Sequence, residues 1–112
     1  MSTNNPELNI SVTFRHTEPT EALKTYATEK IAHMLSKYLV HNADVRVTLS
    51  VEKRDQLAEV VVHSKGCDVS AKSVTADLYS SIDKVVDTLS ALIKKQKEKM
   101  LSQKHQSAAY EM

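Results

Sequence analysis

The chain has 112 residues, of which 41% are hydrophobic and 26% are charged, enough for one folded domain and too few for two. Its single cysteine, Cys67, excludes an intramolecular disulfide, so a secreted disulfide scaffold is excluded as well. The polar start of the chain and the absence of an apolar stretch of about 20 residues lead us to expect a cytoplasmic protein with neither a secretory signal nor a membrane span.

The formal net charge of +1 hides an uneven distribution. Residues 1–93 hold ten Lys and Arg against twelve Asp and Glu, whereas residues 94–105 hold five Lys against one Glu. A basic segment of this density can contact phosphate groups, or it can be the solvated end of a helix whose dipole it complements. Composition alone slightly favours the helix end and leaves both interpretations open.

The first half of the chain predicts a strand, a helix and a second strand. Apolar and polar residues alternate over residues 8–15, the pattern of a half-buried strand. A helix is predicted to begin near Pro19 or Thr20, which can occupy or cap its first turn, and to end near His41 and Asn42. Alternation returns over residues 45–52 and indicates the next strand.

The second half predicts two more strands and a long helix. A turn at residues 53–55 leads into a strand over 58–63, and the turn at Lys65 and Gly66 leads into a strand over 67–72. Thr75 is the predicted N-cap of a helix of about seven turns, which carries the basic segment in its last two turns.

This order, β-α-β-β-β-α, predicts an α+β fold. The crossover through the first helix should make the first two strands parallel, and the short turns should make the remaining pairs antiparallel. Burying every apolar face then requires a four-stranded mixed sheet with both helices packed on one face. The open face would present Arg15, Arg46, His63 and Lys72. We expect residues 8–101 to form the domain, between a flexible extension (1–7) and a flexible tail (102–112).

No motif indicates catalysis, a cofactor or a metal. One Gly cannot form a phosphate-binding loop, and the five His residues and Cys67 lack metal-ligand spacing. Asp83 and Asp87 lie four residues apart, a spacing more typical of a solvated helix face than of a catalytic pair. We therefore expect no enzymatic activity, no cofactor, no metal and no small-molecule substrate.

Three of the four tyrosines, Tyr26, Tyr38 and Tyr79, lie on or beside the apolar stripes of the predicted helices. This position favours packing over stacking on nucleobases. If the protein binds RNA, we expect the shape and backbone of the RNA to dominate recognition.

Several short segments, in a fixed order, resemble the bacterial ribosome hibernation-promoting factors, the family that includes protein Y. The resemblance runs from about Leu8 to Lys99, and its strongest part is Asp77-Leu78-Tyr79-Ser80-Ser81-Ile82-Asp83. The other matching parts are Leu8-Asn9-Ile10-Ser11, Glu18-Pro19-Thr20-Glu21-Ala22-Leu23 with Tyr26 and Lys30, Val47-Thr48-Leu49-Ser50-Val51-Glu52-Lys53, Ala58-Glu59-Val60, Gly66, Val69-Ser70-Ala71 and Leu89.

The resemblance implies a double-stranded-RNA-binding-like fold and binding to ribosomal RNA in the mRNA and tRNA channel of the small ribosomal subunit. Such a factor silences translation in stationary phase or starvation by occupancy alone. The RNA-binding residues that it implies are Lys30, Lys53, Lys95, Lys97 and Lys99, and Lys24 and Lys94 are candidates by location only. Thr88 and Ala91 stand where the family usually has basic residues, so two phosphate contacts are not expected here.

The family has branches with different effects on ribosome pairing. Long forms carry an additional C-terminal domain, and protein Y carries an acidic extension, whereas residues 102–112 here contain Glu111 as their only acidic residue. We therefore expect a short hibernation-promoting factor that favours ribosome dimers, alongside a separate modulation factor. A protein Y-like inactivator of single ribosomes is the alternative. Two other classes, a small α+β enzyme and a module that binds a peptide at the sheet edge, fit the composition less well.

Overall fold

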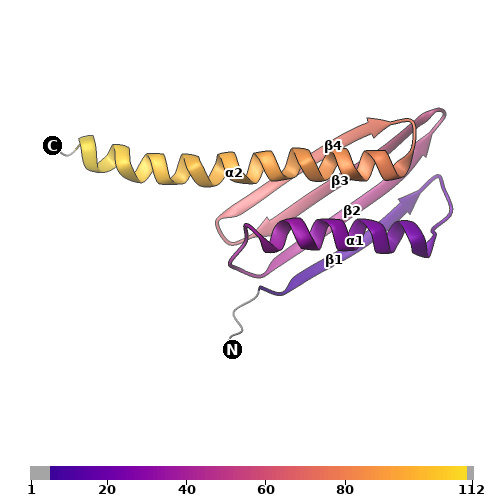
Figure 1. Ribbon diagram of the computed structural model, residues 1–112, viewed down its shortest axis with the longest axis horizontal. Helices are drawn as coiled ribbons and strands as arrows, with labels where there is room; N and C mark the ends of the chain where they lie inside the picture. Colours follow the sequence, from indigo (N-terminus) through magenta and orange to yellow (C-terminus); the bar gives the residue numbers. More distant parts are fainter. Residues whose placement is uncertain (1–5, 111–112) are drawn as a thin grey trace.

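The computed structural model describes the backbone of residues 6–110 and the side chains of residues 6–98. Two helices and four strands follow one another along this part of the chain (Figure 1). They are β1 (Leu8–Arg15), α1 (Glu21–Ser36), β2 (Ala43–Glu52), β3 (Asp55–Ser64), β4 (Cys67–Thr75) and α2 (Leu78–Tyr110). The predicted order of elements is confirmed.

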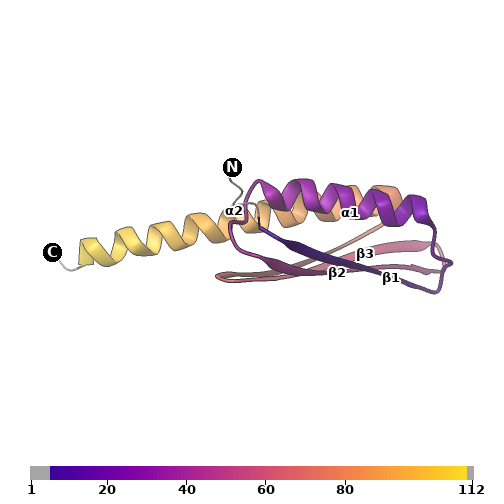
Figure 2. The same ribbon diagram turned by 90° about the horizontal axis from the view of Figure 1, so that it is seen from below.

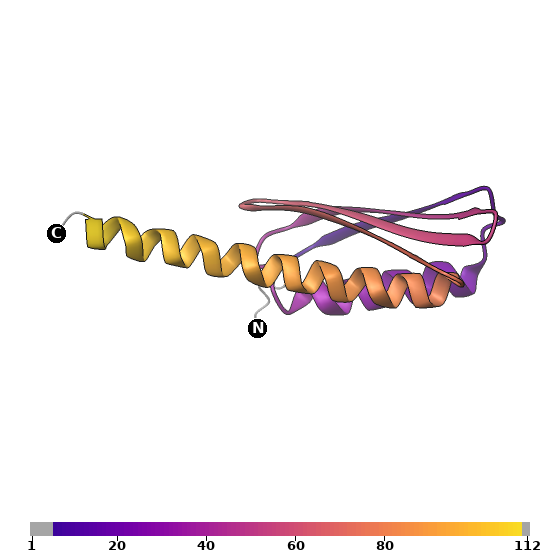
Figure 3. The ribbon, with the colours of Figure 1, turned by 90° about the horizontal axis from the view of Figure 1, so that it is seen from above.

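The four strands form one sheet in the order β1-β2-β3-β4. β1 and β2 are parallel, with Val12 opposite Val47, because α1 carries the chain back to the starting end of the sheet. The other neighbours are antiparallel, with Val47 opposite Val60 and Val60 opposite Ala71. Figures 2 and 3 show both helices on the same face of the sheet, so the predicted α+β architecture is confirmed.

The core lies between this face of the sheet and the two helices. Alternate strand residues point into it, and each helix contributes the residues of its apolar stripe. Burying one such side chain stabilises the fold by about 1.5–3 kcal/mol relative to leaving it in water. The largest fully buried side chains include Ile31 and Leu35 of α1, Val45, Val47, Leu49, Val60 and Val62 of the sheet, and Ile82, Val85, Leu89 and Ile93 of α2.

The start of α1 was predicted correctly and its end was not. Thr20 is the N-cap, and its hydroxyl accepts a hydrogen bond from the Leu23 N–H at 3.1 Å. The helix ends at Ser36 instead of near His41 and Asn42. Its last turn tightens where the Tyr38 N–H binds the Leu35 carbonyl at 3.0 Å. The sequence pattern continues past this point because Tyr38 and Leu39 still pack against the core after the backbone has left the helix.

The N-cap of α1 makes a measurable contribution to stability. Replacing Thr20 with Ala removes the acceptor for the Leu23 N–H, and we expect it to lower the free energy of unfolding by about 1 kcal/mol. Urea denaturation of the purified protein measures this change. Thr25→Ala is the matched control, because Thr25 is exposed within the same helix. Equal stability of the two variants would contradict the role of Thr20 as a cap.

The start of α2 corrects another prediction. Thr75 is the last residue of β4, and Asp77 caps the helix, because the Asp77 Oδ1 accepts a hydrogen bond from the Ser80 N–H at 3.0 Å. Thr75 supports the cap by accepting the Asp77 N–H at 3.2 Å. The helical backbone continues to Tyr110, so the helix end expected at residue 101 is too early. The division into extension, domain and tail stays a prediction.

Two tight turns join the antiparallel strands. Gly66 has φ +77°, so the only glycine of the chain occupies a left-handed conformation that glycine adopts without steric cost. In the turn between β2 and β3, Lys53 adopts a left-handed conformation with φ +59°, which is uncommon for a residue with a side chain. Neither helix within residues 6–110 is long and apolar enough to cross a membrane.

Candidate nucleic-acid interface

A polar cluster of four side chains joins α1 to the first turns of α2; we call it the helix clamp and define it as Tyr26, Lys30, Tyr79 and Asp83. The Asp83 Oδ1 accepts a hydrogen bond from the Tyr26 hydroxyl at 2.6 Å and pairs with the Lys30 Nζ at 3.1 Å. The Lys30 Nζ also lies 5.6 Å from the centre of the Tyr26 ring. The rings of Tyr26 and Tyr79 meet edge to face, with their centroids 5.0 Å apart.

These contacts shift the protonation equilibria of the clamp. The hydrogen bond from Tyr26 is the main cause that lowers the pKa of Asp83, and Lys30 adds to it. The hydrogen-bonded pair with Asp83 likewise raises the pKa of Lys30. Lys30, a predicted RNA-binding residue, is therefore held by an internal carboxylate, and a phosphate group would have to share its ammonium with Asp83.

The lowered pKa of Asp83 predicts a specific loss of stability in acid. A carboxyl group whose pKa is lower in the folded chain stabilises the fold above its usual value of 3.8, and this contribution disappears as the pH falls through the folded-state value. We expect the free energy of unfolding to decrease as the pH is lowered from about 5, and Asp83→Asn to flatten this decrease. Chemical denaturation at several pH values measures both.

Asp87 provides the control for this titration, since it is exposed one turn further along α2. Asp87→Asn removes a carboxylate from the same helix without breaking a clamp contact, so the comparison separates the clamp from a general change of charge. An acid limb that stays unchanged in Asp83→Asn would show that the clamp carboxylate does not contribute to it. Asp77→Asn should also flatten the limb, because a hydrogen bond from the Ser80 hydroxyl lowers the pKa of Asp77.

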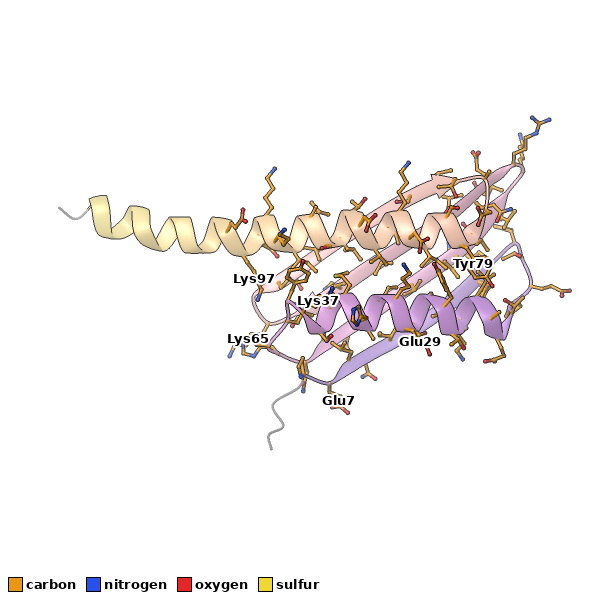
Figure 4. The ribbon with its side chains drawn as sticks, viewed as in Figure 1. Glu7, Glu29, Lys37, Lys65, Tyr79 and Lys97 are labelled. Carbon is orange, nitrogen blue, oxygen red and sulfur yellow. The ribbon has the colours of Figure 1, made fainter. Side chains whose placement is uncertain are left out.

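Three lysines from three separate parts of the chain lie at the same end of the fold (Figure 4). We call Lys37, Lys65 and Lys97 the basic end cluster. Lys37 follows α1, and Lys65 lies in the turn between β3 and β4. The Ser64 hydroxyl donates to the Asn42 carbonyl at 2.9 Å, which holds this turn against the segment that follows α1.

Lys97 lies close enough to Cys67, the first residue of β4, for its charge to influence the pKa of the Cys67 thiol. Burial raises the pKa of the Cys67 thiol, and the positive charge of Lys97 opposes this shift. Lys97 is half-buried, whereas Lys94 and Lys95 are exposed on α2. Lys99 lies outside the described side chains.

The structure separates the predicted RNA-binding residues into distant groups. Lys53 lies in the turn between β2 and β3, and Lys65 lies in the turn between β3 and β4, at the other end of β3. A strand of ten residues spans roughly 30 Å, so Lys53 and the basic end cluster are far apart. Lys24 is exposed on α1. Lys37 and Lys65 were not named from the sequence, because only the pairing of β2 with β3 brings them to the same end of the sheet.

The two positions where the family pattern usually has basic residues are solvent-exposed in α2. Thr88 and Ala91 are both exposed, and the Thr88 hydroxyl donates back to the Lys84 carbonyl at 3.0 Å. A charged side chain would fit at either position, but these two residues offer no cation to a phosphate group. The positive charge of α2 is therefore concentrated at Lys94, Lys95 and Lys97.

The open face of the sheet offers a less suitable surface for phosphate. Arg15, Arg46, His63 and Lys72 are exposed there, as predicted. A groove of 390 Å³ at the end of the sheet that carries Lys65 is also lined by Glu7, Asp44 and Asp68, and the His63 Nδ1 lies 3.2 Å from the Asp68 Oδ1. These carboxylates would repel a polyanion. No group of three or more potential metal ligands occurs among the residues that the structure describes.

Comparison with known proteins shows which family the chain belongs to. The family model described as "Sigma 54 modulation protein / S30EA ribosomal protein" matches residues 10–101. A ribosome hibernation promoting factor of Pseudomonas putida is 33% identical over 95 residues, which are 85% of this chain and 92% of the relative. The chain belongs to the hibernation-promoting factor and protein Y family. The hibernation promoting factor of Escherichia coli K12 is 31% identical over 83% of this chain and 97% of its own length.

Solved structures of other proteins share the fold of this member of the hibernation-promoting factor and protein Y family. The crystal structure of the Thermus thermophilus protein Y N-terminal domain has a TM-score of 0.71 and 29% sequence identity, and covers 80% of this chain and 97% of that domain. A ribosomal subunit interface protein from Coxiella burnetii has the same TM-score at 16% identity and shows the fold alone. Family membership associates this chain with ribosome hibernation.

Proposed function

We propose that this protein binds the small ribosomal subunit at the mRNA and tRNA channel and silences translation in stationary phase or stress. The observation that supports this function is the family match over residues 10–101, together with named hibernation promoting factors that align over 92% and 97% of their length. The protein acts by occupancy in the cytoplasm and makes or breaks no covalent bond. It needs no cofactor.

The proposed contacts to ribosomal RNA are the lysines named from the sequence, with Lys37 and Lys65 added by the structure. Lys95 and Lys97 supply the densest positive charge that the described side chains offer, and Lys94 and Lys99 belong to the same basic segment. Lys24, Lys30 and Lys53 complete the set. Ammonium groups that replace condensed counterions on the phosphates would provide affinity without reading the base sequence.

Sedimentation through a sucrose gradient tests the proposed binding. The protein should migrate with small subunits and with whole ribosomes from starved cells, and nuclease treatment should release it. A protein that stays at the top of the gradient would contradict ribosome binding. Association that survives nuclease would instead support a peptide-binding module.

The same experiment addresses ribosome pairing. We propose that this protein favours ribosome dimers alongside a separate modulation factor, because the relatives that it resembles over almost their whole length are hibernation promoting factors. The gradient profile is compared with and without the protein, in extract that contains the partner factor. A larger dimer peak supports the proposal. A smaller dimer peak would favour the alternative, a protein Y-like inactivator of single ribosomes.

A further inference from the structure

Tyr79 is the one tyrosine among the large hydrophobic side chains that remain exposed in the described part of the fold. Its exposed fraction is 42%, although it lies in the first turn of α2 beside the buried Leu78. Figure 4 shows it on the side of the molecule that carries the helices. Tyr79 packs against Tyr26, as its position beside an apolar stripe predicts, and its ring is also open to solvent.

The geometry of the Tyr26–Tyr79 pair leaves a face of Tyr79 available. The ring planes meet at 71°, so one ring presents its edge to the face of the other. In such a pair Tyr26 can cover at most one face of the Tyr79 ring. An open aromatic face at a fixed angle is a surface on which a nucleobase can stack.

The helix clamp also fixes this ring before any ligand arrives. Tyr26 is anchored by its hydroxyl to Asp83, and Asp83 is paired with Lys30. The nearby Asp77 carboxylate is occupied by the N–H and hydroxyl of Ser80, at 3.0 and 2.6 Å. A ring that is held in place loses little conformational freedom on binding, which lowers the cost of association.

We propose that Tyr79 is a base-stacking residue that binds one unpaired nucleobase of the ribosomal RNA, with the helix clamp holding its ring in position. This inference rests on the proposed function and adds to it a contact that does not depend on phosphate charge. The expectation that RNA shape and backbone alone dominate recognition is then incomplete.

Binding of Tyr79 variants to purified small ribosomal subunits tests the stacking contact. Tyr79→Phe keeps the aromatic face and should bind like the unsubstituted chain. Tyr79→Leu keeps apolar bulk without a π face and should bind roughly 5- to 150-fold more weakly, the range measured for losing one stacked base. The dependence of affinity on salt concentration should be the same for both variants, because no phosphate contact is lost.

A second measurement separates stacking from a structural role of the ring. The chain contains no Trp, so Tyr79→Trp introduces a single indole whose fluorescence should be quenched when small subunits bind. Val74→Trp is the matched control, since Val74 is 44% exposed and lies on the open face of the sheet. Its fluorescence should remain unquenched in the complex.

Each outcome bears on the proposal. A Tyr79→Leu variant that binds as tightly as Tyr79→Phe, or a Tyr79→Trp indole that is not quenched in the complex, would overturn stacking and leave the proposed function intact. An unsubstituted chain that does not bind small subunits would overturn both. Weak binding of Tyr79→Leu with an unchanged salt dependence, together with quenching of the indole at position 79 alone, supports the proposal.

Discussion

The double variant Lys95→Ala, Lys97→Ala should bind small ribosomal subunits more weakly than the unsubstituted chain and with a flatter dependence on salt. If each ammonium contacts one phosphate, the slope of log affinity against log salt should decrease by roughly 1 for each lysine lost. The fold should persist, because Lys95 is exposed and Lys97 is half-buried outside the hydrophobic core. Affinity measured at four or more salt concentrations gives the slope directly.

Lys72 provides the control for this experiment. It is exposed on the open face of the sheet, away from the helices, so Lys72→Ala changes the net charge without touching the proposed interface. Its salt slope should stay close to that of the unsubstituted chain. If the double variant and Lys72→Ala show equal slopes, the lysines of α2 are not phosphate contacts. Adding Lys65→Ala to the double variant should flatten the slope again if the basic end cluster acts as one surface.

Leu89→Ala should lower the stability of the fold more than either Thr20→Ala or Asp83→Asn. Leu89 is fully buried between α2 and the sheet, and truncation removes apolar contacts and leaves a cavity. A decrease of about 2–5 kcal/mol in the free energy of unfolding is expected. Urea denaturation followed by far-ultraviolet circular dichroism provides the measurement.

Leu92 lies in the same helix and is 38% exposed, which makes Leu92→Ala the matched control. The two substitutions remove the same atoms and have the same helix propensity, so the difference between them isolates burial. Leu92→Ala should cost clearly less than Leu89→Ala, because more than a third of Leu92 is already in contact with water. Similar losses in both variants would contradict the position of Leu89 in the core.

The periodicity of apolar residues predicts the type and order of the helices and strands correctly. It predicts their first and last residues less reliably. The alternation over residues 45–52 predicts a strand because a pleated backbone turns successive side chains to opposite faces. The end of α1 was missed because Leu39 is buried after the helix has ended, so burial continues where helical geometry does not. At α2 both Thr75 and Asp77 have suitable side chains for capping, and only the backbone geometry decides between them.

The site was predicted less completely, since its contacts join residues that are distant in sequence. Lys30 and Asp83 are separated by more than 50 residues, and no local pattern indicates that the carboxylate of one helix holds the ammonium of the other. Lys37 and Lys65 come to the same end of the fold because Ala43 at the start of β2 pairs with Ser64 at the end of β3. Lys95 and Lys97, which the resemblance to the family implies as RNA-binding residues, could be named from the sequence because both lie in a continuous basic segment, and their role stays a prediction.

The proposed RNA contacts at Lys53 and at the basic end cluster would together make the protein a bidentate ligand. One nucleic-acid strand advances by about 3.4 Å per nucleotide, so the roughly 30 Å along β3 corresponds to about nine stacked nucleotides. Once one end is bound, the other finds its phosphate at a high effective concentration only if the RNA holds both groups at a fixed distance. A rigid, assembled subunit meets this condition and a flexible RNA strand does not, so under the proposed function this spacing would favour intact ribosomes over free or degraded RNA.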